Sequence, residues 1–587
     1  MKKVVFLLLV MCVILSACTP STGNVGDEDK KTPTPDPTEV GKPTTEPSAK
    51  GSEAELYNDN LSYLEENIVT YFSSKGEADK MSPYDTPIPV SVTNWYSPTI
   101  ENAFVKFEEK YGETFEANRW TDAFKRALNL DVTYKWWAAD ADYNQKLRLD
   151  MTANDLPDIF LVRSQTDLIQ MAQSGAIHDL TDLFDTWATE DDKEVWESDG
   201  GALLQMASYE NRIYGLPSSI SDTDNFSYLW IRSDWMTKLG LEYPKTMDEL
   251  ADVIEAFVNA DMDGNGVNDT VGLVVDKGLF YSTRAIFNAF QAYPEIWVKT
   301  SDDQLIWGGT TDANKDALNF LGSLYEKGYI DPEFITKSGS DALESVISGK
   351  CGVAIGGHWL GHTMGDLHEL DEESDWRCIP IPTGTGDVVK SPLKPTHHGW
   401  LVVNSNFEHP EAAFKMRGLH TYTLKDKDAA WWWYEENITW QISPVRANVS
   451  AYDNLFTYLN LLEAYNNNND TSLLRAKAIS YWANLHGELA WEWEMMFGPE
   501  DKTPMNVLND AYSKDLLFYD AFLGPQSAFM QERWSTIMDE QLVAFTKMII
   551  NEVSVEKGFE DWKNTFINMG GDRITEEVND WYESIKN

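Results

Sequence analysis

Apolar positions along the chain change between two spacings, one typical of helices and the other typical of strands. Leu56, Leu61, Leu64 and Ile68 follow a helical spacing, whereas residues 130–137 alternate between apolar and polar. The expected elements are, in order, helix 54–78, strand 88–92, helix 101–111, strand 130–137, helix 143–151 and strand 158–162. Strands that alternate with helices predict βαβ units and an α/β fold with a largely parallel sheet.

Several tryptophans follow or adjoin the ends of expected strands. Ligands of open parallel sheets bind at the carboxyl ends of the strands. Flat aromatic side chains can stack on sugar rings there, while carboxylate and guanidinium groups bind hydroxyls or a charged group. The alternative for each tryptophan is an ordinary core or surface position. The candidate ligand-binding residues are Trp95, Trp136, Asp155, Trp230, Arg232, Trp359 and Trp400.

Length and charge narrow the class of protein. The 587 residues are too many for one hydrophobic core, so we expect at least two lobes. The formal net charge of −48 repels nucleic acid and anionic lipid, which excludes both as partners. Solubility outside the cell explains the acidity most simply.

The first residues have the layout of a secretory signal. Lys2 and Lys3 precede the apolar run Val4–Ile14, and the small residues Ser16 and Ala17 follow it. The apolar run is shorter than the ~20 residues that a bilayer span needs. The sequence then continues with Thr, Pro, Ser, Gly and charged residues to about residue 53, which predicts a disordered tether.

Leu15-Ser16-Ala17-Cys18 resembles a bacterial lipobox. The resemblance implies cleavage before Cys18, lipidation of its sulfur, and a chain held at the outer face of the cell membrane only through that lipid. Two further cysteines, Cys351 and Cys378, remain in the body of the protein. An exported chain allows a disulfide between them, but both could equally be free and buried.

A series of short segments, in a fixed order along the chain, resembles the solute-binding proteins of ABC importers. The match is closest to the large lipoprotein branch associated with oligosaccharide uptake. The segments are Asn154–Ile159, Gly175–Thr181, Ile213–Pro217, Trp230–Met236, Leu239–Leu241, Pro244–Thr246, Gly349–Ile355, Gly399–Trp400, His409–Ala413 and Ile574–Tyr582.

That resemblance implies a two-lobed α/β fold with a hinge, a cleft between the lobes and additional C-terminal helices. It also implies a monomeric receptor that captures an oligosaccharide and delivers it to the permease subunits of an ABC transporter. The implied boundaries are a signal peptide over 1–17, a tether over 18–53, an N-terminal lobe over 54–215 plus about 396–445, and a C-terminal lobe with a helical section over 216–395 plus about 446–587.

Residues 261–272 resemble the start of a calcium-binding EF-hand loop. Oxygen-bearing residues alternate around Gly266, as hard cations require, but Gly272 replaces the bidentate glutamate expected at the twelfth position. The loop of the oligosaccharide-binding branch often carries Glu where this chain has Thr270. We expect a structural Ca²⁺, with an Asx-rich turn as the alternative. The candidate metal ligands are Asp261, Asp263, Asn265, Val267, Asp269 and Thr270.

Evidence for catalysis in the sequence is weak. His358 and His362 have the spacing of a zinc-hydrolase helix, but Trp359 stands where the general base should be. The sequence contains no P-loop, no Rossmann glycine triplet and no Gly-x-Ser-x-Gly elbow. We therefore expect a binding protein and no enzyme. The remaining alternatives are a receptor for a peptide or another solute, a surface glycoside hydrolase, and an adhesion or sensory lipoprotein.

Overall fold

The computed structural model describes residues 53–586 except 263, 265, 268, 429, 434, 436, 437, 447, 488 and 489. The predicted signal peptide, Cys18 and the tether up to residue 52 lie outside the described residues.

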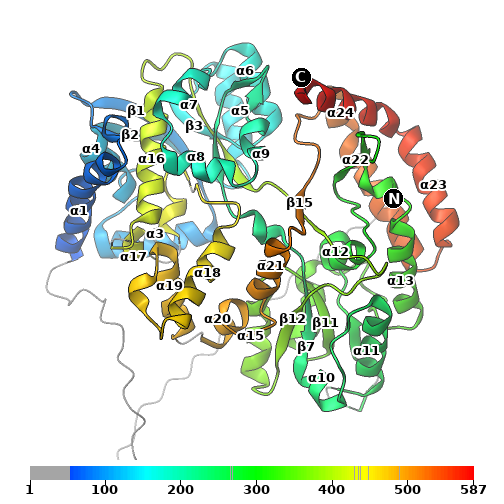
Figure 1. The fold of residues 1–587 in the computed structure, drawn as a ribbon. Coiled ribbons are helices and arrows are strands. Elements are labelled where there is room, and N and C mark those ends of the chain that lie inside the picture. The colour runs from blue at the N-terminus through cyan, green and yellow to red at the C-terminus, as the bar shows by residue number, and fades with distance from the viewer. Residues whose placement is uncertain are drawn as a thin grey trace, which may run out of the picture. The chain divides into compact units, whose positions relative to one another are not determined.

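A five-stranded sheet organises the first part of the chain (Figure 1). Its strands, in spatial order, are β2 (Leu130–Ala139), β1 (Ile88–Tyr96), β3 (Ile159–Val162), β14 (His397–Val403) and β6 (Leu216–Ser219). Strands β1, β2 and β3 are parallel, as the sequence predicted, whereas β14 is antiparallel to both β3 and β6. The carboxyl ends of β1 and β3 therefore lie at the same sheet edge as the first residues of β14.

The elements that build the first core with this sheet come from two distant parts of the sequence. They are α1 (Glu53–Ser74), α2 (Ala78–Met81), α3 (Pro98–Tyr111), α4 (Arg119–Leu128), α5 (Tyr143–Ala153), α6 (Gln165–Ser174), α7 (Thr181–Trp187), α8 (Glu190–Glu197), α9 (Ala202–Met206), β4 (Ser208–Tyr209), β5 (Arg212–Ile213), α16 (Glu411–Lys425) and α17 (Ala430–Trp433).

Local signals explain where these helices begin and end. The Ser97 side chain accepts a hydrogen bond from the Ile100 backbone N–H, and Pro98 occupies the first turn of α3, so the helix starts before the predicted residue 101. Gly112 then ends α3 in the left-handed conformation, with a φ of 75°.

A second, four-stranded sheet follows. Its strands, in spatial order, are β12 (Trp376–Ile379), β7 (Tyr228–Arg232), β11 (Cys351–Gly356) and β8 (Val271–Leu273). Strand β7 is antiparallel to both of its neighbours, and β11 is parallel to β8. The accompanying elements are α10 (Ser233–Leu239), α11 (Met247–Asn259), α12 (Phe280–Ala289), β9 (Trp297–Lys299), β10 (Leu305–Trp307), α13 (Asn314–Glu326), α14 (Gly339–Ile347) and α15 (Leu360–Leu370).

The C-terminal part of the chain covers both faces of the second sheet. Its elements are α18 (Asp453–Asn466), α19 (Ala476–Leu485), α20 (Ala490–Phe497), α21 (Pro504–Ser513), β15 (Leu517–Tyr519), which pairs with β13 (Ser391–Leu393), α22 (Ala528–Ile549), α23 (Val555–Asn568) and α24 (Gly571–Lys586). Successive side chains of β7 point to opposite faces. Leu229 and Ile231 pack in the core shared with α22–α24, whereas Tyr228 and Trp230 pack in the core shared with α18–α21.

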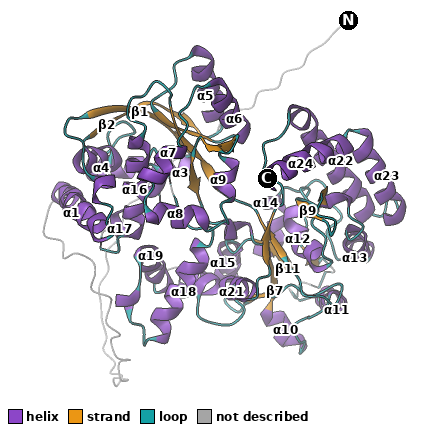
Figure 2. Cartoon of the chain, turned by 45° about the horizontal axis from the view of Figure 1, so that its top comes forward, coloured by secondary structure: helices purple, strands orange, loops and turns teal. Residues whose placement is uncertain are grey.

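Three connections link the two sheets, which Figure 2 shows as separate groups of strands. The first is η1 (Asp222–Asn225) after β6, the second precedes β14, and the third precedes α18. Backbone hydrogen bonds join Ile220 to Thr396 (N···O 3.0 Å) and Asp222 to Ala451 (N···O 2.8 Å). The predicted boundary placed residue 216 in the second lobe, but β6 still belongs to the first sheet, and the chain leaves that sheet only after Ser219.

The thiols of Cys351 and Cys378 form no disulfide. Cys351 lies in β11 and Cys378 in β12, both fully buried, and β7 separates these strands. Of the two alternatives left by the sequence, the structure supports free, buried cysteines.

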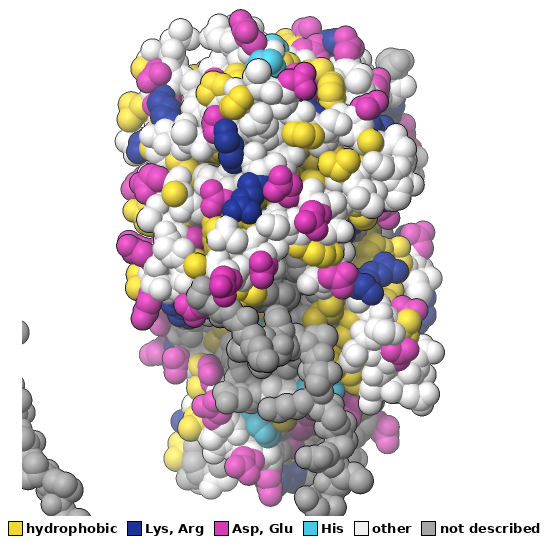
Figure 3. All heavy atoms as spheres, turned by 90° about the vertical axis from the view of Figure 1, so that its left-hand side faces the viewer, with side chains coloured by type: hydrophobic (Ala, Val, Ile, Leu, Met, Phe, Trp, Pro, Cys, Tyr) yellow, Lys and Arg dark blue, Asp and Glu magenta, His cyan; other side chains and the backbone are white. Residues whose placement is uncertain are grey.

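The surface carries the charge that the composition predicted. Acidic side chains are spread over the described part of the face in Figure 3 and do not gather in one patch. None of the helices in the described part of the chain combines the length and apolarity that a membrane span needs.

Candidate functional site

A cavity of about 340 Å³ lies between the edges of the two sheets. We call it the inter-sheet cavity. Ligand pockets usually have volumes of roughly 300–1,000 Å³. The lining residues come from both sheets, from the connections between them and from the C-terminal helices. They are Ile220, Ser221, Asp224, His358, His398, Leu424, Trp440, Gln441, Val449, Asp453, Asn454, Lys477 and Tyr481.

The end of β1 forms a rigid support behind the first-sheet wall. The guanidinium carbon of Arg446 lies 3.7 Å from the ring centroid of Trp95, and that of Arg163 lies 4.6 Å from it. Arg446 also donates to Asn94 Oδ1 (Nη2···Oδ1 2.8 Å) and to the Trp95 carbonyl (2.6 Å). Burial lowers the pKa of Arg446 to about 9, so the group remains a cation at neutral pH. Only 5% of Trp95 is exposed.

His398, at the start of β14, presents a neutral imidazole to the cavity. Its ring centroid lies 6.1 Å from that of Trp95. Burial lowers its pKa to about 3, and the nearby Arg446 and Arg163 cations lower it further. Its Nε2 is buried and has no hydrogen-bond partner in the part of the chain that the structure describes. Gly399 has a φ of 134°, and a Cβ there would lie 2.7 Å from the Val162 carbonyl oxygen, so glycine allows β14 to approach β3 at this point.

The second-sheet wall begins where β11 ends. Burial lowers the pKa of His358 to about 3, and its Nδ1 lies 4.0 Å from Asp224 Oδ1. Partial desolvation at the cavity raises the pKa of the Asp224 carboxyl to about 6. Trp359 follows His358 directly and is 41% exposed. Its ring is nearly parallel to that of Tyr281, with centroids 6.0 Å apart and an interplanar angle of 8°.

The C-terminal helices close a third side of the cavity. Lys477 donates to Asp453 (Nζ···Oδ2 2.5 Å) and to Asn454 Oδ1 (2.6 Å), and the Asn454 amide donates in turn to Asp224. Side chains from α18 and α19 are thereby joined to the first connection between the sheets.

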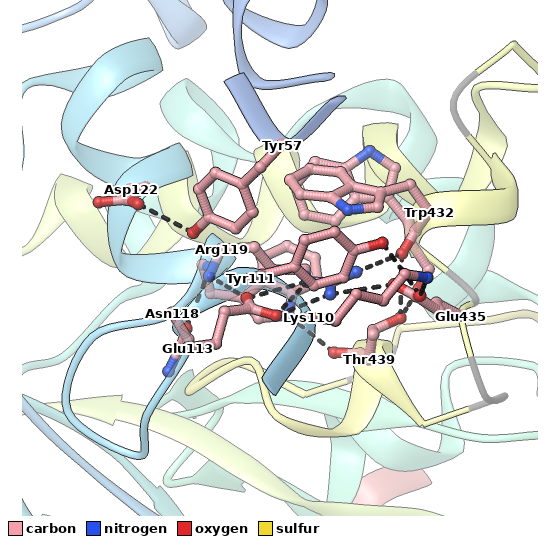
Figure 4. Close-up of polar contacts among 12 residues, drawn as sticks. Tyr57, Lys110, Tyr111, Glu113, Asn118, Arg119, Asp122, Trp432, Glu435 and Thr439 are labelled. Atoms are coloured by element: carbon pink, nitrogen blue, oxygen red, sulfur yellow. Dashed lines mark hydrogen bonds and ion pairs between the residues drawn. The ribbon is translucent and has the colours of Figure 1, made fainter. Parts of the chain in front are cut away.

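A buried ion-pair cluster anchors the segment that brings Trp440 and Arg446 to the cavity (Figure 4). Arg119 is fully buried and pairs with Glu113 (Nη2···Oε2 2.7 Å) and Glu435 (Nη2···Oε2 3.1 Å). Its Nη1 donates to the Trp432 carbonyl (2.7 Å), and its guanidinium carbon lies 4.6 Å from the Trp432 ring centroid. The cluster fixes the chain a few residues before Trp440.

Trp359 and Trp95 are not among the residues that line the inter-sheet cavity, but each lies beside one that does. Trp359 directly follows His358, and the Trp95 ring centroid lies 6.1 Å from that of His398. Trp136 is half-buried on β2, where its Nε1 donates to Asp150 (2.8 Å).

The other predicted site residues need correction. Trp230 and Trp400 are fully buried in hydrophobic cores and offer no surface to a ligand. Strand β7 is antiparallel to β11, so its first residue, Tyr228, lies beside the end of β11. Arg232 lies at the other end of β7, where it pairs with Asp234 (Nη2···Oδ2 2.6 Å). Asp155 precedes β3 and therefore lies at the sheet edge away from the cavity, where it pairs with Lys135 (2.9 Å).

The sequence interpretation missed most of the polar lining. His358 and His398 were not predicted as ligand contacts, and His358 was set aside as half of an incidental pair. A signal was present, since His358 follows Gly356, which ends β11, and Gly357. Asp224 carries no comparable signal, because only the first connection between the sheets brings it to the cavity.

The predicted calcium loop is described in part. Asp263 and Asn265 lie outside the described residues. Asp261 Oδ2 accepts from the Gly266 backbone N–H (3.0 Å), whereas its Oδ1 and the Thr270 hydroxyl are buried and have no hydrogen-bond partner among the described residues. Asp269 pairs with Lys350, and Val267 is exposed. Among the described residues no group of three or more His, Cys, Asp and Glu could hold a metal ion. The two unpartnered oxygens nevertheless fit a hard cation.

Comparison with known proteins finds two relatives in sequence that cover different shares of the chain. Lipoprotein LipO of Bacillus subtilis is 24% identical over 469 residues, which cover 77% of this chain and 86% of LipO. The fructooligosaccharide ABC transporter substrate-binding protein FusA of Streptococcus pneumoniae is 32% identical over 222 residues, which cover 34% of this chain and 40% of FusA. FusA is, by its name, the substrate-binding protein of an ABC transporter.

Solved structures agree with the sequence matches. The HMO-binding, ABC-transporter-associated solute-binding protein of Bifidobacterium longum infantis aligns with a TM-score of 0.58 and 16% identity, over 85% of this chain and 99% of that chain. The FusA EF-hand mutant in complex with fructo-nystose aligns with a TM-score of 0.51 and 18% identity, over 85% of this chain and 99% of that chain. These likenesses show the two-lobed solute-binding protein fold that the sequence predicted. A family model for the bacterial extracellular solute-binding proteins matches residues 108–416, more than half of the chain, and this protein belongs to that family.

Proposed function

We propose that this protein captures an oligosaccharide in the inter-sheet cavity and delivers it to the permease of an ABC transporter. One observation carries the proposal. A cavity of about 340 Å³ takes its walls from both sheets, so that a ligand bound there contacts both lobes at once. A ligand that contacts both lobes stabilises the closed arrangement, because those contacts are complete only when the lobes come together.

The side chains at the cavity favour a sugar. Beside the lining residue His358, Trp359 and Tyr281 offer exposed aromatic faces for the C–H face of a ring. His358 and His398 are neutral at pH 7, and each neutral imidazole has one donor and one acceptor for hydroxyl groups. The Asp224 carboxylate adds a strong acceptor. Fructooligosaccharide binding by FusA, as its name states, supports the same ligand class.

We further propose that Cys18 carries a lipid that holds the mature protein at the extracellular face of the cell membrane. The lipobox-like segment before Cys18 and the name of LipO as a lipoprotein support this anchor. The tether would let a monomeric body reach the permease, and binding without catalysis would suit that role.

We propose Ca²⁺ as a structural ion of the loop over residues 261–270. Asp261 and Thr270 would contribute their unpartnered buried oxygens, and Val267 would contribute its backbone carbonyl. The ion would hold the entry to β8, at the end of the second sheet away from His358. The FusA EF-hand mutant among the structural neighbours supports a related loop in this fold.

A thermal-shift screen followed by calorimetry tests the ligand class. The panel contains oligosaccharides of several linkages, with peptides of similar size as the matched comparison. We expect at least one oligosaccharide to raise the melting temperature, because a ligand that binds only the folded state stabilises it by mass action. Mass spectrometry should recover that oligosaccharide intact. Stabilisation by peptides alone, or cleavage of the glycan, would contradict the proposal.

A further inference from the structure

A second cavity of about 370 Å³ lies next to the inter-sheet cavity. It is bounded by α8, α16, α18 and the start of α19, and we call it the helical cavity. Figure 1 shows α18 and α19 beside α16, and α19 contacts both of the other helices. Leu424, Val449, Asp453 and Lys477 line both cavities. The two cavities are therefore neighbours that share one wall.

Aromatic side chains stand exposed at the rim of the helical cavity. Phe456 lines it and is 43% exposed, and Tyr512 beside it is 40% exposed. Their ring centroids lie 6.2 Å apart, and Tyr452 lies 4.9 Å from Tyr512 and 6.0 Å from Phe456. Grouped exposed aromatic rings beside a cavity mark a binding surface.

The polar groups of the helical cavity are held in place by the protein. The Asn460 side chain donates to the Leu473 carbonyl (3.0 Å) and accepts from the Arg475 backbone N–H (2.8 Å). Lys425 pairs with Glu194 (3.3 Å). Side chains fixed in this way lose little freedom when a ligand arrives. Charges of both signs line the cavity, which suits a neutral polyhydroxyl ligand better than one with a single strong charge.

We propose that the helical cavity binds the distal units of the same oligosaccharide whose first units occupy the inter-sheet cavity. The glycan would pass along the Asp453–Lys477 pair in the shared wall, with Phe456 as the stacking surface for a distal ring. The protein would therefore prefer long oligosaccharides to short ones. This inference rests on the proposed function and adds a chain-length specificity to it.

Calorimetry with length series tests the inference. The probes are malto-, xylo-, fructo- and galacturonic-acid oligosaccharides, each from the shortest available member to the hexasaccharide. In the series that binds, we expect the Kd to fall about tenfold or more from the shortest member to the longest, equivalent to about 1.4 kcal/mol. Phe456→Ala should remove that gain and leave the Kd of the shortest member unchanged.

Two control variants separate the cavities. Trp359→Ala, at the inter-sheet cavity, should weaken short and long members alike. Ile567→Ala, an exposed apolar residue on α23, should change neither. Equal affinity for all lengths, or an equal effect of Phe456→Ala on all lengths, would overturn the helical subsite and leave the proposed function standing. Binding by none of the series would overturn the proposed function and the subsite with it.

Discussion

The two walls of the inter-sheet cavity are built in different ways. On the first sheet, Trp95 is 5% exposed and has two guanidinium groups, those of Arg163 and Arg446, against its ring. On the second sheet, Trp359 is 41% exposed and stacks only loosely on Tyr281, with ring centroids 6.0 Å apart. One wall is complete before any ligand arrives, whereas the other still has an aromatic face open to solvent.

This difference between the walls predicts different effects on the stability of the fold and on the affinity for the ligand. A wall that is fixed in advance loses little conformational freedom on binding, but its residues also support the fold. An exposed aromatic face contributes little to the fold and gains its contacts only when a ligand covers it. Substitutions in the first wall should therefore affect folding and binding together, whereas substitutions in the second wall should affect binding alone.

Arg446→Met should have the largest effect. It removes the Arg446 donor from the Trp95 carbonyl and from Asn94 Oδ1, which keeps only the Trp95 backbone N–H, so we expect the free energy of unfolding to fall by about 2–4 kcal/mol. Oligosaccharide affinity should fall with it. Urea unfolding and calorimetry measure both quantities. Arg163→Met is the matched control, with a smaller loss of stability because that side chain is 28% exposed. Equal stability of Arg446→Met and the wild type would refute the claim that the first wall stabilises the fold.

Trp359→Ala should affect binding only. Loss of the exposed stacking face should raise the Kd roughly ten- to hundredfold, which corresponds to about 1.4–2.8 kcal/mol. The melting temperature should stay that of the wild type, because the indole is not part of a core. Trp359→Phe keeps a smaller ring, so its Kd should lie between those of the wild type and Trp359→Ala. Early melting of Trp359→Ala would show instead that the second wall supports the fold as the first does.

The neutral His398 makes the first wall sensitive to acid. Its pKa is about 3 in the fold and about 6.5 in an unfolded chain, so below pH 6.5 protons bind the unfolded chain preferentially. The stability that His398 supports is fully present above pH 6.5 and is lost as the pH falls towards 3. From pH 7 to pH 5, the wild type should lose about 2 kcal/mol more unfolding free energy than His398→Gln.

Urea unfolding at several pH values measures this difference. Ile567→Ala, at an exposed residue of α23 that carries no titratable group, is the control and should follow the wild type. Identical pH profiles for His398→Gln and the wild type would mean that His398 is not held neutral by the first wall.

Calcium should have the smallest effect on binding. The loop over residues 261–270 enters the second sheet at the end opposite His358, so removal of the ion should leave the Kd unchanged. A chelator should lower the melting temperature by roughly 2–4 °C, and Asp261→Asn should abolish that sensitivity. If the chelator leaves the melting temperature of the wild type unchanged, the loop is better explained as a plain Asx turn. A change in Kd on chelation would show that the loop affects the second wall.

Most of the local structure could be predicted from the sequence. The expected strand over 130–137 is β2 (Leu130–Ala139), and the expected helix over 143–151 is α5 (Tyr143–Ala153). Both depend on spacing within one segment. The position of Trp95 followed from a second local rule, because parallel strands such as β1 bring their carboxyl ends to one edge.

The errors at the candidate site arise where strand direction reverses. Strand β7 is antiparallel to β11, and β14 is antiparallel to β3, so β7 and β14 begin, rather than end, at the sheet edge nearest the cavity. The rule that ligands bind at the carboxyl ends of strands therefore misplaced Trp230 and Arg232 and missed His398. Strand direction depends on which distant segments pair. The apolar pattern of β7 alone does not indicate that it pairs with β11 and β12, or in which direction.

Hydrogen–deuterium exchange, with and without the oligosaccharide selected by calorimetry, tests most directly whether one ligand joins the two walls. The account predicts slower exchange on both sides of the cavity, at the start of β14 and residues 448–453 on one side and at residues 356–362 on the other. The core amides of β7 should not change. Protection confined to one wall, or to a surface away from both, would contradict a ligand held between the two sheets.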